Sequence, residues 1–258
     1  MFDDDGCRRI LMRHFKVNTL IGLGVEEFPT GILAAGALLQ YLYDTQKTDL
    51  EHFTHISPYL TSKYMLLDSS TRRNLELTET LREKQKRGSL LWVLDKTKTA
   101  MGGRLLRNYI EQPLIDKEEM EKRLDAIQEL NQDSISRDEI REYLNPVYDL
   151  ERLLSKVTYK TANPRDLIAF RNSLQMLPPI KTVLAGFQKE ELAAIREEID
   201  GLEDIYQLID EAIVEEPPIS IREGGMIKDQ FDETIDHLRA AKPVSYTHLR
   251  AHETTLHL

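Results

Sequence analysis

Apolar residues recur at helical spacing through most of the chain beyond residue 89, and this periodicity limits the possible folds more than any other feature. In the segment 116–130, Asp116 and Glu119 have the Asp-x-x-Glu spacing of a capping box at a helix start. The apolar residues that follow at intervals of three or four are Met120, Leu124, Ile127 and Leu130. They form one stripe, and we expect this stripe, including Leu124, to be buried.

The following segments repeat this pattern. Leu153 lies in the stripe of residues 150–157, and we expect it to be buried too. In the string NPRD, Asn163 suits the N-cap, Pro164 the first helical position and Asp166 the first turn. The inward face of that helix is expected to be Leu167, Phe170, Leu174 and Leu177, with Pro178 and Pro179 ending the helix.

Further apolar stripes at residues 192–202 and 205–213 predict two more helices. In the string PPISIREGGMI, alternating isoleucines precede Gly224 and Gly225, which indicates a tight turn or hairpin. Another helix is expected from near Asp229 to Lys242.

The N-terminal part predicts two helices joined by a short link between residues 10 and 46. Consecutive small residues, from Ala34 to Ala37 with Gly36 among them, permit the second helix to pack closely. A short β-like run lies at Tyr64–Leu67, and beyond Ser69 strand and helix are both compatible with the pattern. The sequence therefore predicts a mainly α protein with a few short strands.

Composition excludes several classes of protein. The 258 residues carry a net charge of -10, which is the wrong sign for a self-sufficient nucleic-acid binder. A single cysteine rules out an intrachain disulfide, and no apolar run reaches the roughly 18 to 20 residues of a membrane span. We therefore expect a cytoplasmic protein with no membrane association.

Charge is nevertheless uneven along the chain. The stretch from Arg82 to Arg107 is basic, whereas the stretch from Lys189 to Asp236 is dominated by carboxylates that should repel a duplex. Both fit ordinary solvated surfaces. The candidates for weak contact with phosphates are Arg82, Lys84, Lys86 and Arg87.

No catalytic, cofactor-binding or metal-binding constellation emerges. The string G-x-x-x-x-G-K-[ST] is absent, and Gly22 and Gly24 lack the third glycine of a dinucleotide site. His52 and His55 lie three residues apart without further ligands at a diagnostic spacing. The acidic run Asp3, Asp4 and Asp5 is typical of a solvated segment, and Asp149, Glu151 and Arg152 are typical of ion pairs on a helix face.

The last sixteen residues, 243–258, break the acidic helical rhythm and hold three of the seven histidines. A frayed natural tail and a metal-binding histidine cluster are two interpretations. The string SYTHLRAHET is similar to translated vector sequence, so we expect a non-native, dispensable tail.

Five strings, in order, resemble MutS proteins: HFKVNTLIGLGVEEFPTGILAAGALLQYLYDTQ, MLLDSSTRRNLELTETL, TKTAMGGRLLRNYIEQPL, DLERLLSKVTYKTANPRDL and PPISIREGGMI. The resemblance covers about residues 8–242. It implies that residues 1–50 are the C-terminal remnant of an α/β connector domain. Residues 51–242 are implied to be the first half of the helical core or lever domain, truncated before the DNA clamp.

The residues that match family motifs are structural. Those at the start of the core domain are Thr71, Arg72, Arg73, Asn74 and Leu75. Those of a helix-packing motif are Met101, Gly102, Arg104 and Leu105, and those of the later helix start are Asn163, Pro164, Arg165 and Asp166. The chain departs from the family at Ala100, where we expect proline, and at Gly103, where we expect serine or threonine.

The resemblance implies one set of functions for the whole parent protein and a more limited one for this chain. The parent protein is expected to bind mismatched double-stranded DNA as a homodimer, to use ATP and magnesium for clamp motion, and to recruit a MutL-type partner. The domains for those activities are missing, so no catalytic, cofactor or metal residue is carried over to this chain. We therefore expect a non-enzymatic core fragment that transmits conformational change; the alternative is a free-standing helical scaffold for protein interaction without a nucleic-acid role.

Overall fold

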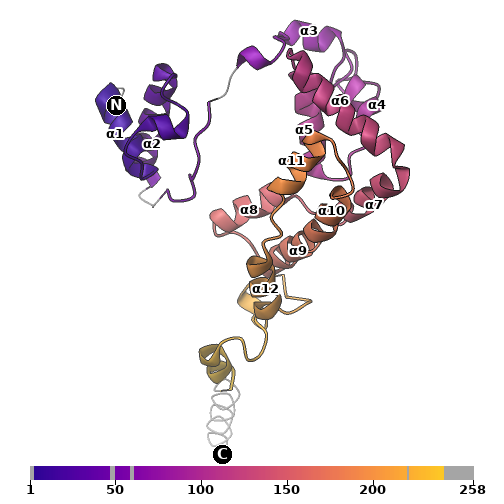
Figure 1. Ribbon diagram of the computed structural model, residues 1–258. Coiled ribbons are helices and arrows are strands. Elements are labelled where there is room, and N and C mark those ends of the chain that lie inside the picture. The colour runs from indigo at the N-terminus through magenta and orange to yellow at the C-terminus, as the bar shows by residue number, and fades with distance from the viewer. Residues whose placement is uncertain (1–2, 47–49, 59–60, 220, 241–258) are drawn as a thin grey trace, which may run out of the picture. The chain divides into compact units, whose positions relative to one another are not determined.

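The computed structural model describes residues 3–46, 50–58, 61–219 and 221–240, and most of them are helical (Figure 1). This confirms the mainly α prediction. The chain divides into two compact units, Met1–Leu66 and Leu67–Leu258. The tail predicted at 243–258 lies outside the described residues.

Unit 1 is built on two helices, α1 (Asp4–His14) and α2 (Pro29–Gln46), with short 3₁₀ turns at η1 (Leu20–Leu23) and η2 (Thr61–Lys63). Asp3 caps α1, because its carboxylate accepts the backbone N–H of Gly6 at 2.8 Å. Helices α1 and α2 pack against each other so closely that a Cβ on Gly36 would lie 2.5 Å from the Cβ of Cys7. The expected close packing of the small-residue helix is thus confirmed. The buried core of the unit consists of Ile10, Leu11, Leu20, Val25, Ile32, Leu39 and Leu50.

Unit 2 is a succession of short helices (Figure 1). They are α3 (Ser69–Asn74), α4 (Leu90–Leu94), α5 (Ala100–Glu111), α6 (Lys117–Gln132), α7 (Ser134–Leu144), α8 (Leu150–Thr158), α9 (Pro164–Leu174), α10 (Leu177–Leu184), α11 (Glu190–Glu198), α12 (Glu203–Ala212) and η3 (Ile221–Glu223). Residues 233–240 are helical as well.

Three apolar clusters hold these helices together. A small one near α4 and α5 contains Leu77, Leu91 and Ile110. A second contains Ala126, Ile180, Leu184, Phe187 and Leu192, where α6, α10 and α11 meet. The third contains Leu153, Phe170, Leu174, Ile209 and Ile213, where α8, α9 and α12 meet. Helix α9 therefore occupies the centre of the last cluster.

The predicted helix starts are confirmed at both capping sites. The Asp116 carboxylate accepts the N–H groups of Glu118 and Glu119 at 2.8 and 3.4 Å. At α9 the capping box is complete, since Asn163 accepts the N–H of Asp166 at 2.9 Å and the Asp166 carboxylate accepts the N–H of Asn163 at 3.0 Å.

The two prolines expected to end α9 instead begin the next helix. Helix α9 already ends at Leu174, and Pro178 and Pro179 lie in the first turn of α10, which starts at Leu177. The first turn of a helix tolerates proline because the N–H groups there have no partner within the helix. The proline pair was therefore a start signal, and the prediction of a stop was wrong.

The predicted burial of the α6 stripe is wrong for Leu124 and Ile127, whereas Leu130 at its end does pack on the core. Leu124 and Ile127 are 62% and 60% exposed, and the buried residue on α6 is Ala126. The face turned toward α10 and α11 is rotated from the predicted one, since it holds Ala126 together with Leu130. Leu153, by contrast, is 8% exposed, as predicted.

The glycine pair forms the predicted reversal as a wide loop. An antiparallel bridge joins Ile213 to Ile227, and the chain turns at Gly224 and Gly225, both with φ of 73°. Glycine adopts this left-handed conformation without strain. The β-like run expected at Tyr64–Leu67 is reduced to a single bridge residue, Tyr64, and residues 65–67 are irregular.

The difference in burial between Leu153 and Leu124 predicts how much each side chain contributes to stability. Leu153→Ala should lower the free energy of unfolding by about 2–5 kcal/mol, because it removes buried methyl groups and leaves a cavity. Leu124→Ala should change it by less than about 0.5 kcal/mol, because the side chain is mostly in solvent. Denaturant titrations of both variants check this, and equal losses would contradict the burial described here.

Candidate functional site

The motif at the start of the core domain lies on α3 and the turn after it. The Asp68 carboxylate caps α3 by accepting the N–H of Thr71 at 2.6 Å, and this hydrogen bond lowers the pKa of Asp68. Arg72 fixes the same turn, because its Nε donates to the carbonyl of Leu67 at 3.0 Å. Arg73, Asn74 and Leu75 are exposed.

The buried residue in this region is Leu77. Its backbone carbonyl accepts the N–H of Leu91 at 2.9 Å, and the Glu76 carbonyl accepts that of Leu90 at 3.1 Å. These bonds join the exit of α3 to the start of α4. The motif thus shapes the beginning of the core.

The four basic residues considered for phosphate contact lie in the loop between α3 and α4, and all are exposed. Lys86 is engaged by Asp95; the hydrogen bond from Lys86, with a second one from Thr97, lowers the pKa of Asp95 to about 2. Arg82, Lys84 and Arg87 have no ion pair with any residue that the structure describes. Three cations of the four therefore remain available to a phosphate backbone.

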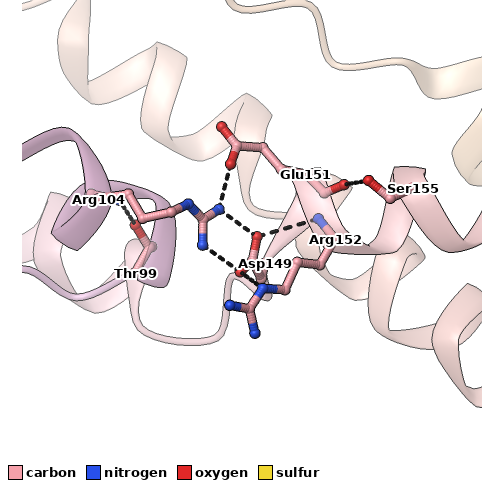
Figure 2. A network of polar contacts seen from close by, with 7 residues as sticks. Thr99, Arg104, Asp149, Glu151, Arg152 and Ser155 are labelled. Atoms are coloured by element: carbon pink, nitrogen blue, oxygen red, sulfur yellow. Dashed lines mark hydrogen bonds and ion pairs between the residues drawn. The ribbon is translucent and has the colours of Figure 1, made fainter. Parts of the chain in front are cut away.

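The helix-packing motif places Arg104 in a polar joint between α5 and α8 (Figure 2). Its Nη1 and Nη2 donate to the two carboxylate oxygens of Asp149 at 2.7 and 2.8 Å, and Nη2 also donates to Glu151. Such a two-point guanidinium–carboxylate contact fixes orientation as well as distance. It raises the pKa of Arg104 and lowers that of Asp149.

The helices on both sides of this joint are capped by residues next to them in the sequence. On α5, the Thr99 hydroxyl caps the helix by accepting the N–H of Gly102 at 3.0 Å, and a Cβ on Gly102 would lie only 3.1 Å from that hydroxyl. On α8, Asp149 is the N-cap and accepts the N–H of Arg152 at 3.4 Å. Met101 is partly buried and Leu105 is 51% exposed.

The expected local ion pair is present, since the guanidinium of Arg152 lies 3.3 Å from Asp149. The stronger partner, Arg104, is 45 residues away in sequence and could not be inferred from spacing. The only sequence signal was that both residues lie in motifs shared with one family.

The motif at the start of α9 contributes further links. Lys156 of α8 lies 2.7 Å from the capping carboxylate of Asp166, and Arg165 donates to the carbonyl of Pro217 at 3.0 Å. The pKa of Asp166 is lowered; burial acts against this, and the bonds from Lys156 and the Asn163 N–H outweigh it. Pro164 is buried.

The described residues do not fit ATP or magnesium. Among residues 3–46, 50–58, 61–219 and 221–240, no three histidines, cysteines or carboxylates are close enough to hold a metal ion. Gly22 and Gly24 lie in and after a 3₁₀ turn without a strand-to-helix phosphate cradle, and His52 and His55 are exposed. Across the same residues, none of the helices has the length and apolar character that crossing a membrane requires.

The Arg104–Asp149 pair predicts a pH-dependent stability difference. Its pairing lowers the folded-state pKa of Asp149 below the ordinary value of 3.8, so the stabilisation is present above that pH and is lost as the pH falls through the folded-state pKa. Arg104→Gln should therefore lower the melting temperature clearly at pH 7 and progressively less below about pH 4.

The matched control for that experiment is Arg107→Gln on the same helix. Within the described part of the chain Arg107 pairs only with Glu111, four residues away at 2.8 Å, and its side chain is 54% exposed. Its loss should have little effect, because exposed pairs of this kind contribute little. Equal melting temperatures for the two variants at pH 7 would show that the joint does not stabilise the fold.

Comparison with known proteins places these features in a family. Residues 70–256 match the family model described as MutS domain III, and residues 2–56 match MutS domain II. The domain III match extends into residues 243–256, whose non-native origin stays a prediction. The predicted boundary at residues 50 and 51 also stays a prediction.

Named relatives agree with these matches. DNA mismatch repair protein MutS of Lachnoclostridium phytofermentans is 61% identical over 241 residues, which are 93% of this chain and 26% of that protein. The proteins of the same name from Ruminiclostridium cellulolyticum and Halothermothrix orenii are 51% and 50% identical, over 93% and 90% of this chain and 27% and 26% of their own lengths. The chain thus spans about a quarter of the relatives it matches. The chain therefore belongs to the MutS family, and its two matched segments correspond to domains II and III of that family.

Proposed function

We propose that this chain is a structural and transmission part of a DNA mismatch-repair protein. Membership of the MutS family supports the repair role. The observation that carries the transmission role is the two-point contact between Arg104 and Asp149, which connects α5 to α8. Energetic coupling between distant sites travels through packed elements with discrete arrangements, and a two-point ion pair is either made or broken.

We assign the activities of the longer protein to residues outside this chain. We infer that mismatched duplex DNA, a MutL-type partner, homodimer formation and the cofactors ATP and magnesium belong to the longer protein, in the cytoplasm. The chain itself is proposed to be non-catalytic and to bind no cofactor, because its sequence lacks a phosphate cradle.

A free-standing interaction scaffold without a nucleic-acid role is the competing proposal. Amphipathic helices alone would permit it. The family matches do not favour it, since all three relatives named above are mismatch-repair proteins by name.

A chimeric protein tests the transmission role. Residues 8–242 would replace the matching segment of the Lachnoclostridium phytofermentans relative, and Arg104→Gln and Arg107→Gln would be compared in that chimera. Arg104→Gln should leave mismatch binding and ATP hydrolysis near the unaltered level but slow ATP-triggered release from the mismatch by about tenfold. The Arg107→Gln control should release normally. Unchanged release in Arg104→Gln, or equal slowing in both variants, would contradict the proposal.

The chain alone should bind DNA weakly and without preference for a mismatch. Its exposed loop cations contact phosphates at most, and phosphate contacts carry no base information. Titration of matched and mismatched duplexes at about 50 and 200 mM salt should show equal affinities that fall steeply with salt. A parallel phosphate-release assay should remain at background.

Two double variants with the same change in net charge locate this weak binding. Lys84→Glu with Arg87→Glu should abolish it, whereas Lys117→Glu with Lys160→Glu should weaken it less. Tighter binding to the mismatch that persists at the higher salt would show that these residues read DNA themselves. Equal loss in both double variants would exclude the α3–α4 loop as the contact.

A further inference from the structure

An apolar groove of about 400 Å³ lies among α7, α10 and α11 and the end of α6. Nine leucine and isoleucine residues and two arginines line it. Three of the aliphatic residues, Ile180, Leu184 and Leu192, are only 6%, 5% and 4% exposed and belong to the second core cluster of unit 2. They form the floor, while Ile195 at the edge is 43% exposed. The groove is therefore open to solvent above a well-packed floor.

The two arginines are the charged residues that line this groove, and no carboxylate does. Arg137 and Arg141 are four residues apart on α7, so they share one face of the helix. Arg137 donates to the side chain of Asn131 at 3.0 Å and lies 3.6 Å from Asp138. Arg141 is half-buried, and its side chain has no hydrogen bond or ion pair with any residue that the structure describes.

The donors of the Arg141 guanidinium remain accessible to water, because no buried side-chain nitrogen or oxygen among the described residues lacks a hydrogen-bond partner. They are therefore free to bind an anionic group at the groove through charge-assisted hydrogen bonds. The bordering aliphatic surface would at the same time bury apolar groups of the same ligand. The groove thus fits a ligand that is both apolar and acidic.

We propose that this groove binds an amphipathic helix of a partner protein. Leucine or isoleucine residues of that helix lie on the aliphatic floor, and two carboxylates one turn apart face Arg137 and Arg141. The spacing of the two arginines, one helical turn, matches carboxylates at positions i and i+4. Docking of an amphipathic helix in an apolar groove is a recurrent mode of peptide recognition.

The shape of the groove favours a helix over a small acidic amphiphile. A pocket for a small ligand usually buries about 70–90% of the ligand surface. This groove is open along the edge that holds Ile195, so a small molecule lying in it would keep much of its surface in water. A helix lies along an open groove and inserts only its side chains.

The test uses the full chain and a fluorescent synthetic peptide. The peptide repeats leucine at alternating intervals of three and four, with glutamates one turn apart beside the leucines; the comparison peptide carries lysine in place of every glutamate. Fluorescence anisotropy should show binding of the glutamate peptide and at least about tenfold weaker binding of the lysine peptide.

Variants of the chain then localise the interaction. Arg141→Glu and Ile195→Asp should each weaken binding of the glutamate peptide by about tenfold or more. Lys160→Glu, which changes the net charge as much as Arg141→Glu but lies outside the groove, should bind as the unaltered chain does. Circular dichroism of each variant establishes that it remains folded.

Three outcomes would overturn the proposal. One is equal binding of the two peptides, and another is unchanged binding by Arg141→Glu. The third is binding of dodecanoate, sensitive to Arg141→Glu, without binding of either peptide, which would assign the groove to a small amphiphile.

Discussion

Helix α9 is buried on its apolar face and on part of its polar face, and the packing of unit 2 depends on how these polar groups are satisfied. Phe170 and Leu174 point into the cluster shared with α8 and α12. Arg171 and Ser173 are also buried, at 7% and 0% exposure. A buried guanidinium is tolerated only with partners. Glu215 supplies two contacts at 2.8 Å and Asp210 a third at 2.7 Å.

Polar contacts of this kind also connect successive helices to one another. The buried Ser173 hydroxyl accepts the N–H of Tyr148 at 2.9 Å, which fixes the chain just before α8. The next residue, Asp149, caps α8 and holds Arg104 of α5 (Figure 2). Arg171 holds Asp210 of α12 and the loop beyond it. A continuous set of specific polar contacts therefore runs from α5 through α8 and α9 to α12, which supports the proposed transmission role.

Other surfaces of unit 2 expose apolar side chains to solvent. The exposed stripe of α6, with Leu124 and Ile127 each about three-fifths exposed, and the groove beside Arg141 both leave apolar surface in water. Contiguous apolar patches on a protein surface commonly mark interaction sites. The groove proposed above to bind an amphipathic helix is one such patch.

Features whose causes lie within a few residues could be predicted from the amino-acid sequence. The caps at Asp116 and Asn163 were predictable because each side chain binds N–H groups two or three positions away. Burial of Leu153, the helical class and the family resemblance also followed from local spacing and ordered motifs.

The apolar face that each helix buries, and the charges that meet, depend instead on how the helices pack together. Periodicity shows that α6 has an apolar stripe, but the neighbouring helices decide whether that stripe is covered, and here they cover Ala126 instead of Leu124. The pairing of Arg104 with Asp149 spans 45 residues and depends on how α5 and α8 pack. Local rules act through the backbone over one or two turns, whereas these choices depend on the competition of distant surfaces for burial.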